Sequence, residues 1–354
     1  MATPKSLSFT IIGTTKAFLL LLLVVTGAVI LPFCDSTFLY AFPIGSLTAR
    51  KAPTLNDRPI IGIMAQPTGS ALSRFGKTYI AASYVKWIES GGARVVPIPY
   101  NLPESELRRL FESLNGVVFP GGGTDLTNDD GSWTPYLKSL GLFVNWSIQS
   151  FNNGGDYFPI WGTCLGMQSL SIILSGNPYI LEGGFDSYNI SMPLNFTHSI
   201  PETRQISRIF NTCPLTYMTT LSTKAVTLNN HHYGVPISNW NSNQKINTEN
   251  NLLATNRDRK GREFVSLFEN KRYPFFASQF HPEKIAFEWC HEDIDHSYDS
   301  LLANQYFSQF FVNECRKSQH KFKTESDELK ALIYNYTPVY TYPVEPDFAQ
   351  CYFF

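Results

Sequence analysis

A cysteine between two glycines, Cys164, is the residue best placed for chemistry in this sequence. The apolar run Phe158–Trp161 predicts a buried strand, and the stretch after Gly166 has apolar residues at helical spacing. The turn from Gly162 to Gly166 has the strand–turn–helix pattern of a nucleophile elbow, with cysteine in place of serine. The glycines leave room that a Cβ would fill. A helix N-terminus favours a thiolate, so we expect Cys164 to be a nucleophile rather than a core cysteine.

A nucleophilic thiol needs a base, and the base needs an acceptor that orients it. The segment His281-Pro282-Glu283 follows a predicted strand that ends at Phe280. Residues two apart in extended chain point the same way, so one side chain could reach the thiol while the other holds the imidazole. Alone, the pair would indicate a surface histidine beside an acid. Together with the elbow, it predicts His281 as the base and Glu283 as the orienting acid.

A carbonyl oxygen that becomes negatively charged during attack needs two preorganised N–H donors. Leu165, directly after the cysteine, offers one. We expect the other from Gly121 or Gly122 in the loop Pro120–Gly123. The alternative for this loop is a plain turn. A phosphate loop is disfavoured because no Gly-Lys-Ser/Thr follows.

Strands and helices alternate around these residues. Apolar runs and helical periodicity predict strands at Ile60–Met64, Arg94–Ile98 and Gly116–Phe119, with helices at Tyr79–Ser90, Glu104–Leu114 and Tyr136–Asn152. This order is typical of an α/β fold, a three-layer α/β/α arrangement with a mostly parallel central sheet. Sites in such sheets lie at the carboxyl ends of strands, where the Cys164 turn and the 120–123 loop should open together.

The second half of the chain is less regular. Residues Leu181–Ile246 are polar, and we expect short strands and long loops there, forming a small capping region. Two strands at Phe264–Phe268 and Phe275–Phe280 are joined by a basic turn, and Leu301–Ser318 predicts an amphipathic helix. The tail closes with Cys-Tyr-Phe-Phe, which indicates that it packs back onto the domain.

Composition excludes several classes of protein. The 354 residues carry a formal net charge of −1, with 43% hydrophobic and 14% aromatic residues. This indicates a packed globular core and gives no reason to expect a nucleic-acid partner. The six cysteines form no CxxC pair, so a zinc site is not expected. If Cys164 is catalytic and Cys34 is removed, four cysteines remain, with three possible disulfide pairings or none.

The N-terminal segment predicts targeting to the secretory pathway. Residues Ala17–Phe33 are almost wholly apolar, which is typical of a signal peptide within 1–35, followed by a linker at 36–57. An uncleaved signal anchor is the alternative. We expect an extracellular, lysosomal or vacuolar protein without stable membrane association once the leader is removed. Four N-x-[ST] sequons agree with this route, at Asn145, Asn189, Asn195 and Asn335.

The Cys164 elbow, followed 117 positions later by His281-Pro-Glu, resembles the class I glutamine amidotransferase superfamily. Four narrower stretches, with the leader and the closing QCYFF, resemble the gamma-glutamyl (folylpoly-gamma-glutamate) hydrolase family: RPIIGI from Arg58, YIAASYVKWIESGGARVVPI from Tyr79, FPGGGTDL from Phe119 and MPLNFT from Met192. The resemblance implies a catalytic domain over residues 58–320 and a tail, 321–354, that packs on it.

The resemblance also implies roles for single residues. Cys164 would be the nucleophile, His281 the base and then the acid, and Glu283 the orienter. A second histidine of importance in the capping region falls on His232, with His231 as its rival.

Two further positions bear on the substrate. Tyr79 matches a tyrosine near the substrate in the family, with packing at the start of a helix as the alternative role. Gln168 is a departure, because hydrolases of this family often carry an acid there. Glutamine at this position resembles an amidotransferase, in which it grips the glutamate portion of the substrate.

The activity that the resemblance implies is hydrolysis of gamma-glutamyl bonds in folate and antifolate polyglutamates through a thioester. It implies a small-molecule substrate, no metal or organic cofactor, and a homodimer. A glutaminase of the amidotransferase type, or a hydrolase of other small gamma-glutamyl amides, is the alternative. A non-catalytic binding glycoprotein that kept the fold is a third possibility.

Overall fold

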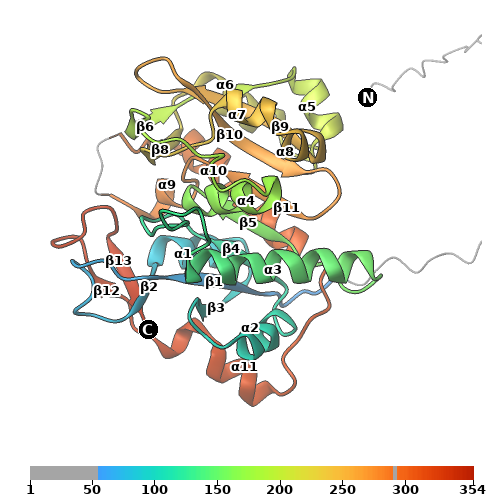
Figure 1. The fold of residues 1–354 in the computed structure, drawn as a ribbon, viewed down its shortest axis with the longest axis vertical. Coiled ribbons are helices and arrows are strands. Elements are labelled where there is room, and N and C mark those ends of the chain that lie inside the picture. Colours follow the sequence, from blue (N-terminus) through green and yellow to red (C-terminus); the bar gives the residue numbers. More distant parts are fainter. Residues whose placement is uncertain (1–54, 290–292) are drawn as a thin grey trace, which may run out of the picture. The chain divides into compact units, whose positions relative to one another are not determined.

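The computed structural model describes residues 55–289 and 293–354, so the predicted leader at 1–35 and most of the 36–57 linker lie outside the described residues. One large mixed sheet organises the rest (Figure 1). Its centre is parallel, in the order β3 (Arg94–Pro99), β1 (Ile60–Pro67), β4 (Gly116–Phe119), β5 (Ile160–Thr163) and β11 (Phe275–Ser278).

Antiparallel strands extend this centre on both sides. Beyond β11 lie β10 (Glu263–Asn270), β9 (Asn250–Arg257) and β7 (Asn195–Phe196). At the other side, the end of β1 pairs with β2 (Thr78–Ala81), followed by β13 (Gln350–Phe353) and β12 (Val339–Tyr340). The predicted β10–β11 hairpin and the packing of the tail onto the domain are therefore both present.

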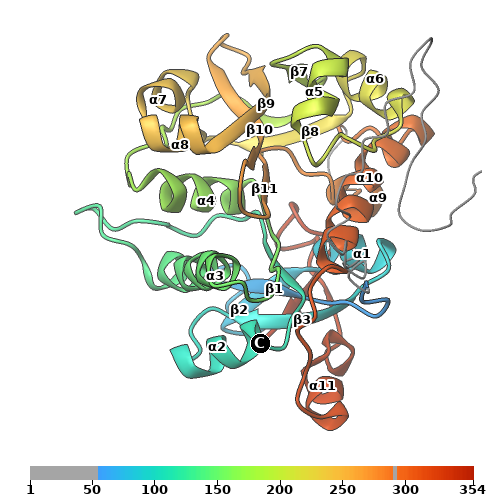
Figure 2. The same ribbon diagram turned by 90° about the vertical axis from the view of Figure 1, so that its right-hand side faces the viewer.

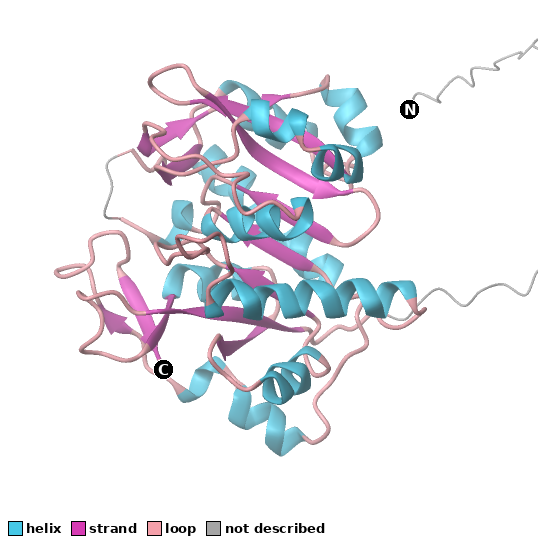
Figure 3. Ribbon diagram, in the orientation of Figure 1, coloured by secondary structure: helices cyan, strands magenta, loops and turns pink. Residues whose placement is uncertain are grey.

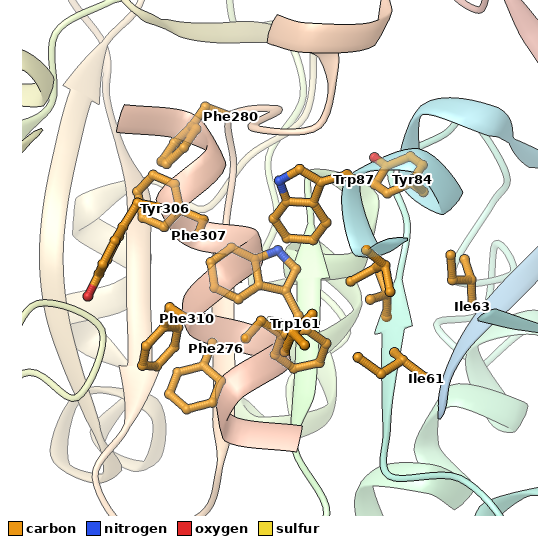
Figure 4. Packing of buried hydrophobic residues seen from close by; sticks show 14 of the residues in the cluster. Ile61, Ile63, Tyr84, Trp87, Trp161, Phe276, Phe280, Tyr306, Phe307 and Phe310 are labelled. Atoms are coloured by element: carbon orange, nitrogen blue, oxygen red, sulfur yellow. The ribbon is translucent and has the colours of Figure 1, made fainter. Parts of the chain in front are cut away.

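The central strands are buried on both faces, and successive residues serve opposite faces. In β1, Ile61 and Ile63 pack into one hydrophobic cluster while Ile60 and Met64 pack into the other. Trp161 of β5 centres the first cluster. Figure 4 shows it among aromatic side chains that include Trp87, Phe276 and Phe307. Its ring centroid lies 5.7 Å from that of Trp87, 6.4 Å from Phe276, 5.9 Å from Phe307 and 6.0 Å from Phe311.

Helices cover both faces, which confirms the three-layer α/β/α prediction (Figure 2). One face carries α1 (Ala82–Ser90), α9 (Lys284–Phe287) and α10 (Tyr298–Cys315). The other carries α2 (Glu104–Phe111), α3 (Pro135–Asn152) and α4 (Leu165–Ser175). The tail adds α11 (Glu325–Ala331) and the short 3₁₀ turn η1 (Ile333–Asn335). None of the helices in the described ranges is long and apolar enough to cross a bilayer.

One predicted helix begins too early. Residues 79–81, taken as the first turn of a helix, lie in β2, and α1 begins at Ala82. In β2, Ala81 pairs with Cys351 and Tyr79 with Phe353. Pairing with a strand 270 residues away thus overrides the local helical periodicity, because tertiary context outweighs a weak intrinsic propensity.

The predicted capping region contains more helix than expected (Figure 3). Its two-stranded sheet joins β6 (Ser187–Met192) and β8 (Thr227–His231). Four short helices accompany it: α5 (Ile200–Ile206), α6 (Leu215–Thr223), α7 (Ile237–Ser242) and α8 (Gln244–Glu249). Two of them begin with a polar cap that overall composition does not reveal, the Ser199–Glu202 capping box of α5 and Asn243 before α8.

The described cysteines are unpaired. Cys164, Cys213, Cys315 and Cys351 are free thiols and all are buried. Burial raises the pKa of the Cys213 and Cys351 thiols to about 12, despite a hydrogen bond at each that opposes the shift. Cys34 and Cys290 lie outside the described residues.

Candidate active site

Cys164 occupies a strained turn between a strand and a helix. It follows the last residue of β5 and has φ of 50° and ψ of −106°, while α4 begins at Leu165. A positive φ is uncommon for a residue with a side chain and is found where the surroundings fix the backbone. Here the Cys164 N–H donates to the Ser278 carbonyl of β11 at 2.7 Å. The predicted elbow geometry is thus present, and Cys164 as a whole residue is 5% exposed.

Both glycines of the elbow are required by close backbone approaches. A Cβ on Gly166 would lie 1.9 Å from the Phe119 carbonyl oxygen, at the end of β4. A Cβ on Gly162 would lie 2.6 Å from the carbonyl carbon of Gly166. Any side chain at either position would therefore push the strand and the helix apart.

The predicted base and its orienting acid lie in the loop after β11. His281 Nδ1 is 2.7 Å from Glu283 Oε1, and both side chains are buried. The His281 N–H donates to the Leu228 carbonyl of β8 at 2.9 Å, which ties this loop to the capping region. The Cys164 side chain also lies close enough to the His281 imidazole to raise its pKa. The fold thus brings Cys164 close to the His281–Glu283 pair, 117 residues further along the sequence.

The electrostatics of this group favour a charged imidazole. Burial alone lowers the pKa of His281, but attraction by the Glu283 carboxylate and the Cys164 sulfur, with a hydrogen bond to each, outweighs it. The pKa of His281 rises to about 9. At neutral pH this imidazole is therefore protonated beside the cysteine sulfur.

The 120–123 loop borders the same site. An ideal Cβ on Gly121 would lie 2.6 Å from His281 Cε1 and 3.2 Å from Cys164 Cβ. The Gly121 N–H, however, donates to the Tyr84 hydroxyl at 2.7 Å. The Gly122 N–H makes no hydrogen bond with the residues that the structure describes. Of the two predicted donors in this loop, Gly122 is therefore the better candidate, with Leu165 at the start of α4 as the other.

Tyr84 is a site residue that the sequence did not single out. It is fully buried in α1, and its hydroxyl lies 3.4 Å from His281 Nδ1. Burial, and then the charges of Glu283 and Cys164, raise the pKa of Tyr84 well above its usual value, so the hydroxyl stays neutral. The only signal in the sequence was a tyrosine on an apolar helix face, where a buried hydroxyl needs a partner.

Tyr79 has different surroundings. Its ring packs against Phe348 of the tail at 5.9 Å between centroids, and burial raises the pKa of its phenol. Tyr84 is the tyrosine that contacts the His281 loop, and proximity of Tyr79 to a substrate remains a prediction.

The two candidate histidines of the capping region differ in environment. His231 is buried against Phe264, at 4.8 Å between ring centroids, and bonds the Tyr233 carbonyl through Nδ1 at 2.9 Å. Burial, together with the charge of nearby His281, lowers the pKa of His231 to about 3, although the bond to Tyr233 opposes the shift. His232 is exposed and stacks on Tyr188. The buried histidine of the two is thus His231, the rival candidate, and which of them contacts a substrate remains a prediction.

Gln168 lies in the first turns of α4, the helix that follows Cys164, and is 4% exposed. Its Nε2 donates to the Tyr233 carbonyl at 2.7 Å and to Gln279 Oε1 at 3.4 Å. Both amide hydrogens are thus directed at protein acceptors, which leaves Oε1 for any direct contact with a substrate.

The four sequons differ in how freely the asparagine is presented. Asn145 and Asn195 are exposed, on α3 and β7, and Asn189 is partly buried with φ of 46°. Asn335 is exposed, but its Nδ2 donates to three backbone carbonyls near the end of α11. Glycosylation at each remains a prediction.

Comparisons with known proteins agree with this geometry. The family model for peptidase C26 matches residues 59–283, a range that includes Cys164, His281 and Glu283. Gamma-glutamyl hydrolase B of Dictyostelium discoideum is 41% identical over 90% of this chain and 89% of its own. Human gamma-glutamyl hydrolase is 43% identical over 84% and 90%, and gamma-glutamyl hydrolase 1 of Arabidopsis thaliana is 36% identical over 81% and 80%.

Among solved structures, a glutamine amidotransferase from Thermotoga maritima covers 73% of this chain and 97% of its own, with 12% identity and a TM-score of 0.40. The family model spans residues 59–283, more than half of the chain, and these curated relatives are 36–43% identical over 81–90% of it. The chain therefore belongs to the peptidase C26 family, the family of these gamma-glutamyl hydrolases.

Proposed function

We propose that this protein hydrolyses gamma-glutamyl bonds of folate poly-gamma-glutamates, with Cys164 as nucleophile, His281 as acid and base, and Glu283 as the orienting group. The observation that carries the proposal is the buried group of these three side chains, with the 2.7 Å bond between His281 and Glu283 and a protonated imidazole beside the sulfur. The curated relatives that carry the name gamma-glutamyl hydrolase support the bond type.

Acylation needs a nucleophile, an acid and an oxyanion site. The Cys164 thiolate attacks the side-chain carbonyl carbon of a gamma-linked glutamate, and the carbonyl oxygen takes the negative charge. The N–H groups of Leu165 and Gly122 stabilise that charge. The tetrahedral intermediate collapses, the C–N bond breaks, and His281 donates its proton to the departing amine.

Deacylation reverses the role of the histidine. Neutral His281 takes a proton from water, and the hydroxide formed attacks the thioester carbonyl. The C–S bond breaks with its electron pair on sulfur, which regenerates the thiolate and the protonated imidazole. Glu283 holds the ring through Nδ1 in both steps, so that Nε2 exchanges the proton.

The substrate class is tested by product analysis. Purified protein incubated with folate pentaglutamate should release shortened folates and glutamate species, identified by mass spectrometry, and Cys164→Ala should release none. The product lengths distinguish cleavage inside the glutamate chain from removal of terminal glutamates. Absence of products from the unaltered protein would contradict the proposed substrate, and glutamine and small gamma-glutamyl amides would then be assayed.

A further inference from the structure

Two buried glutamines, Gln168 and Gln279, are hydrogen-bonded to each other next to Cys164. Gln279, in the loop between β11 and His281, is fully buried, and its N–H donates to the Ser266 carbonyl of β10 at 2.8 Å. Gln168 lies one turn along α4 from Cys164, and its N–H donates to the Cys164 carbonyl at 2.9 Å. Both backbones are thus fixed by the same elements that hold the cysteine.

The side-chain hydrogen bonds form a chain in which Gln168 donates to Gln279 and Gln279 donates to the sulfur of Cys164. Gln168 Nε2 donates to Gln279 Oε1 at 3.4 Å, and Gln279 Nε2 donates to Cys164 Sγ at 3.5 Å. The orientation of Gln168 follows from the Tyr233 carbonyl at 2.7 Å, because a carbonyl oxygen only accepts. Since Gln168 therefore turns its NH₂ group toward Gln279, the latter must present its oxygen to Gln168 and its own NH₂ group to the sulfur.

We propose that Gln279 is a further catalytic residue, whose amide N–H stabilises the thiolate of Cys164, and that Gln168 is a positioning residue that sets the orientation of this amide. The proposal rests on the assignment of Cys164 as nucleophile made above. A donor aimed at sulfur favours the charged thiolate over the neutral thiol, because hydrogen bonds to a charged group are the stronger ones.

The donor acts at two points of the reaction. In the resting enzyme this hydrogen bond adds to the attraction between the thiolate and the protonated His281. During deacylation the C–S bond breaks and its electron pair returns to sulfur, where Gln279 is already in place to receive the charge. The Gln279 amide need not reorient during the reaction, because Gln168 holds it and the Tyr233 carbonyl in turn holds Gln168.

Alkylation by iodoacetamide tests the proposal without any substrate, since only the thiolate reacts. The rate would be measured across pH 4–10 by mass spectrometry of the Cys164 peptide. Gln279→Met should move the midpoint of this profile to higher pH by about one unit, the size expected for losing one hydrogen bond to a charged group. Gln168→Met should move it in the same direction by less. With folate pentaglutamate, Gln279→Met should lower kcat more than it raises KM.

Ser266→Ala is the matched control. It removes a buried hydrogen bond, from Ser266 Oγ to Asn256 Oδ1 at 2.7 Å, in the strand beside Gln279, but it touches nothing at the sulfur. Its alkylation profile should overlap that of the unaltered protein. Thermal unfolding of each variant shows whether it folds.

A Gln279→Met profile that overlaps that of the unaltered protein would overturn the proposal. If this variant does not fold, an unchanged profile for Gln168→Met overturns it instead. Failure of the proposed function is a separate result: Cys164 of the unaltered protein would then resist alkylation at every pH at which the protein is folded.

Discussion

At the scale of single residues, the site depends on charges that stabilise each other inside the protein. His281 and Glu283 are buried and joined by a 2.7 Å contact, and the nearby Cys164 sulfur also acts on the imidazole. A buried pair of this kind is costly to break, because removing one member leaves the other charge without compensation. Neighbouring Tyr84 stays neutral and holds the Gly121 N–H, so it fixes the loop without adding charge.

The His281 pair makes stability depend on pH. The pKa of His281 is raised from 6.5 to about 9, so the folded state gains stability that is fully present below pH 6.5 and is lost as pH rises through 9. The free energy of unfolding should fall by up to about 3 kcal/mol across this range. Glu283→Gln removes the main attraction and should flatten this slope in urea unfolding curves recorded at pH 6 to 9.5. An equally steep slope in Glu283→Gln would show that this ion pair is not its source.

The sequence pointed to candidate site residues that stand in a recognisable short motif. It did not point to residues that reach the site only through contacts made by the folded chain. Cys164, His281 and Glu283 were predictable because each lies at the end of a strand in a distinctive short motif. Tyr84, Gln66 and Gln279 carry no such motif. Gln66, for example, donates to the Gly121 carbonyl at 2.7 Å from 55 residues away, a contact that only the folded sheet creates. The sequence placed the second histidine at His232, with His231 as its rival, and the choice between these adjacent positions stays a prediction.

At the scale of elements, backbone proximity holds the site together. The elbow joins β5 to α4, its cysteine N–H is bound by β11, and Gly166 lies against the end of β4. Three neighbouring parallel strands therefore determine where the sulfur lies. Apolar runs predicted these central strands well, because strands buried on both faces are continuously hydrophobic. Strand β2, which lies between β1 and β13, and the short helices of the capping region were missed, because distant pairing determines the strand and local caps contribute to the helices.

Gly166→Ala tests this arrangement. The added Cβ would lie 1.9 Å from the Phe119 carbonyl oxygen, a backbone atom that cannot turn aside. The variant should lose about 1–3 kcal/mol of unfolding free energy, or more, and most of its kcat as the thiol moves. Gly123→Ala is the matched control, because a Cβ there meets nothing within 4 Å. Equal behaviour of the two variants in denaturation and turnover would mean that backbone proximity does not set the site.

At the scale of the whole molecule, the C-terminal tail pairs with a strand of the sheet and makes hydrogen bonds to the rest of the domain. Strand β13 pairs with β2, Lys284 Nζ donates to the Asp347 carbonyl at 2.8 Å, and the Ala349 N–H donates to Glu288 at 2.7 Å. Lys284 and Glu288, the two residues that these tail contacts involve, come directly after the His281 loop in the sequence. The tail thus supports the part of the molecule that holds the proposed base.

The proposed secretory route is tested by glycosylation. Protein expressed in a secreting eukaryotic cell should lose mass on enzymatic deglycosylation, and glycopeptide mapping should find Asn145 occupied, because it is exposed on α3. Asn145→Gln should remove that glycopeptide and leave activity unchanged. An unaltered gel position after deglycosylation would contradict passage through the secretory pathway.

The claim on which the account depends most is that Cys164 forms a covalent thioester. Acid-quenched reactions with folate pentaglutamate, analysed by intact-protein and peptide mass spectrometry, measure this directly. We expect a folyl-glutamyl adduct on the Cys164 peptide, bound to sulfur and released by hydroxylamine, and neither adduct nor turnover in Cys164→Ala that is folded by circular dichroism. Undiminished turnover in folded Cys164→Ala, or an adduct on a different residue, would contradict the mechanism.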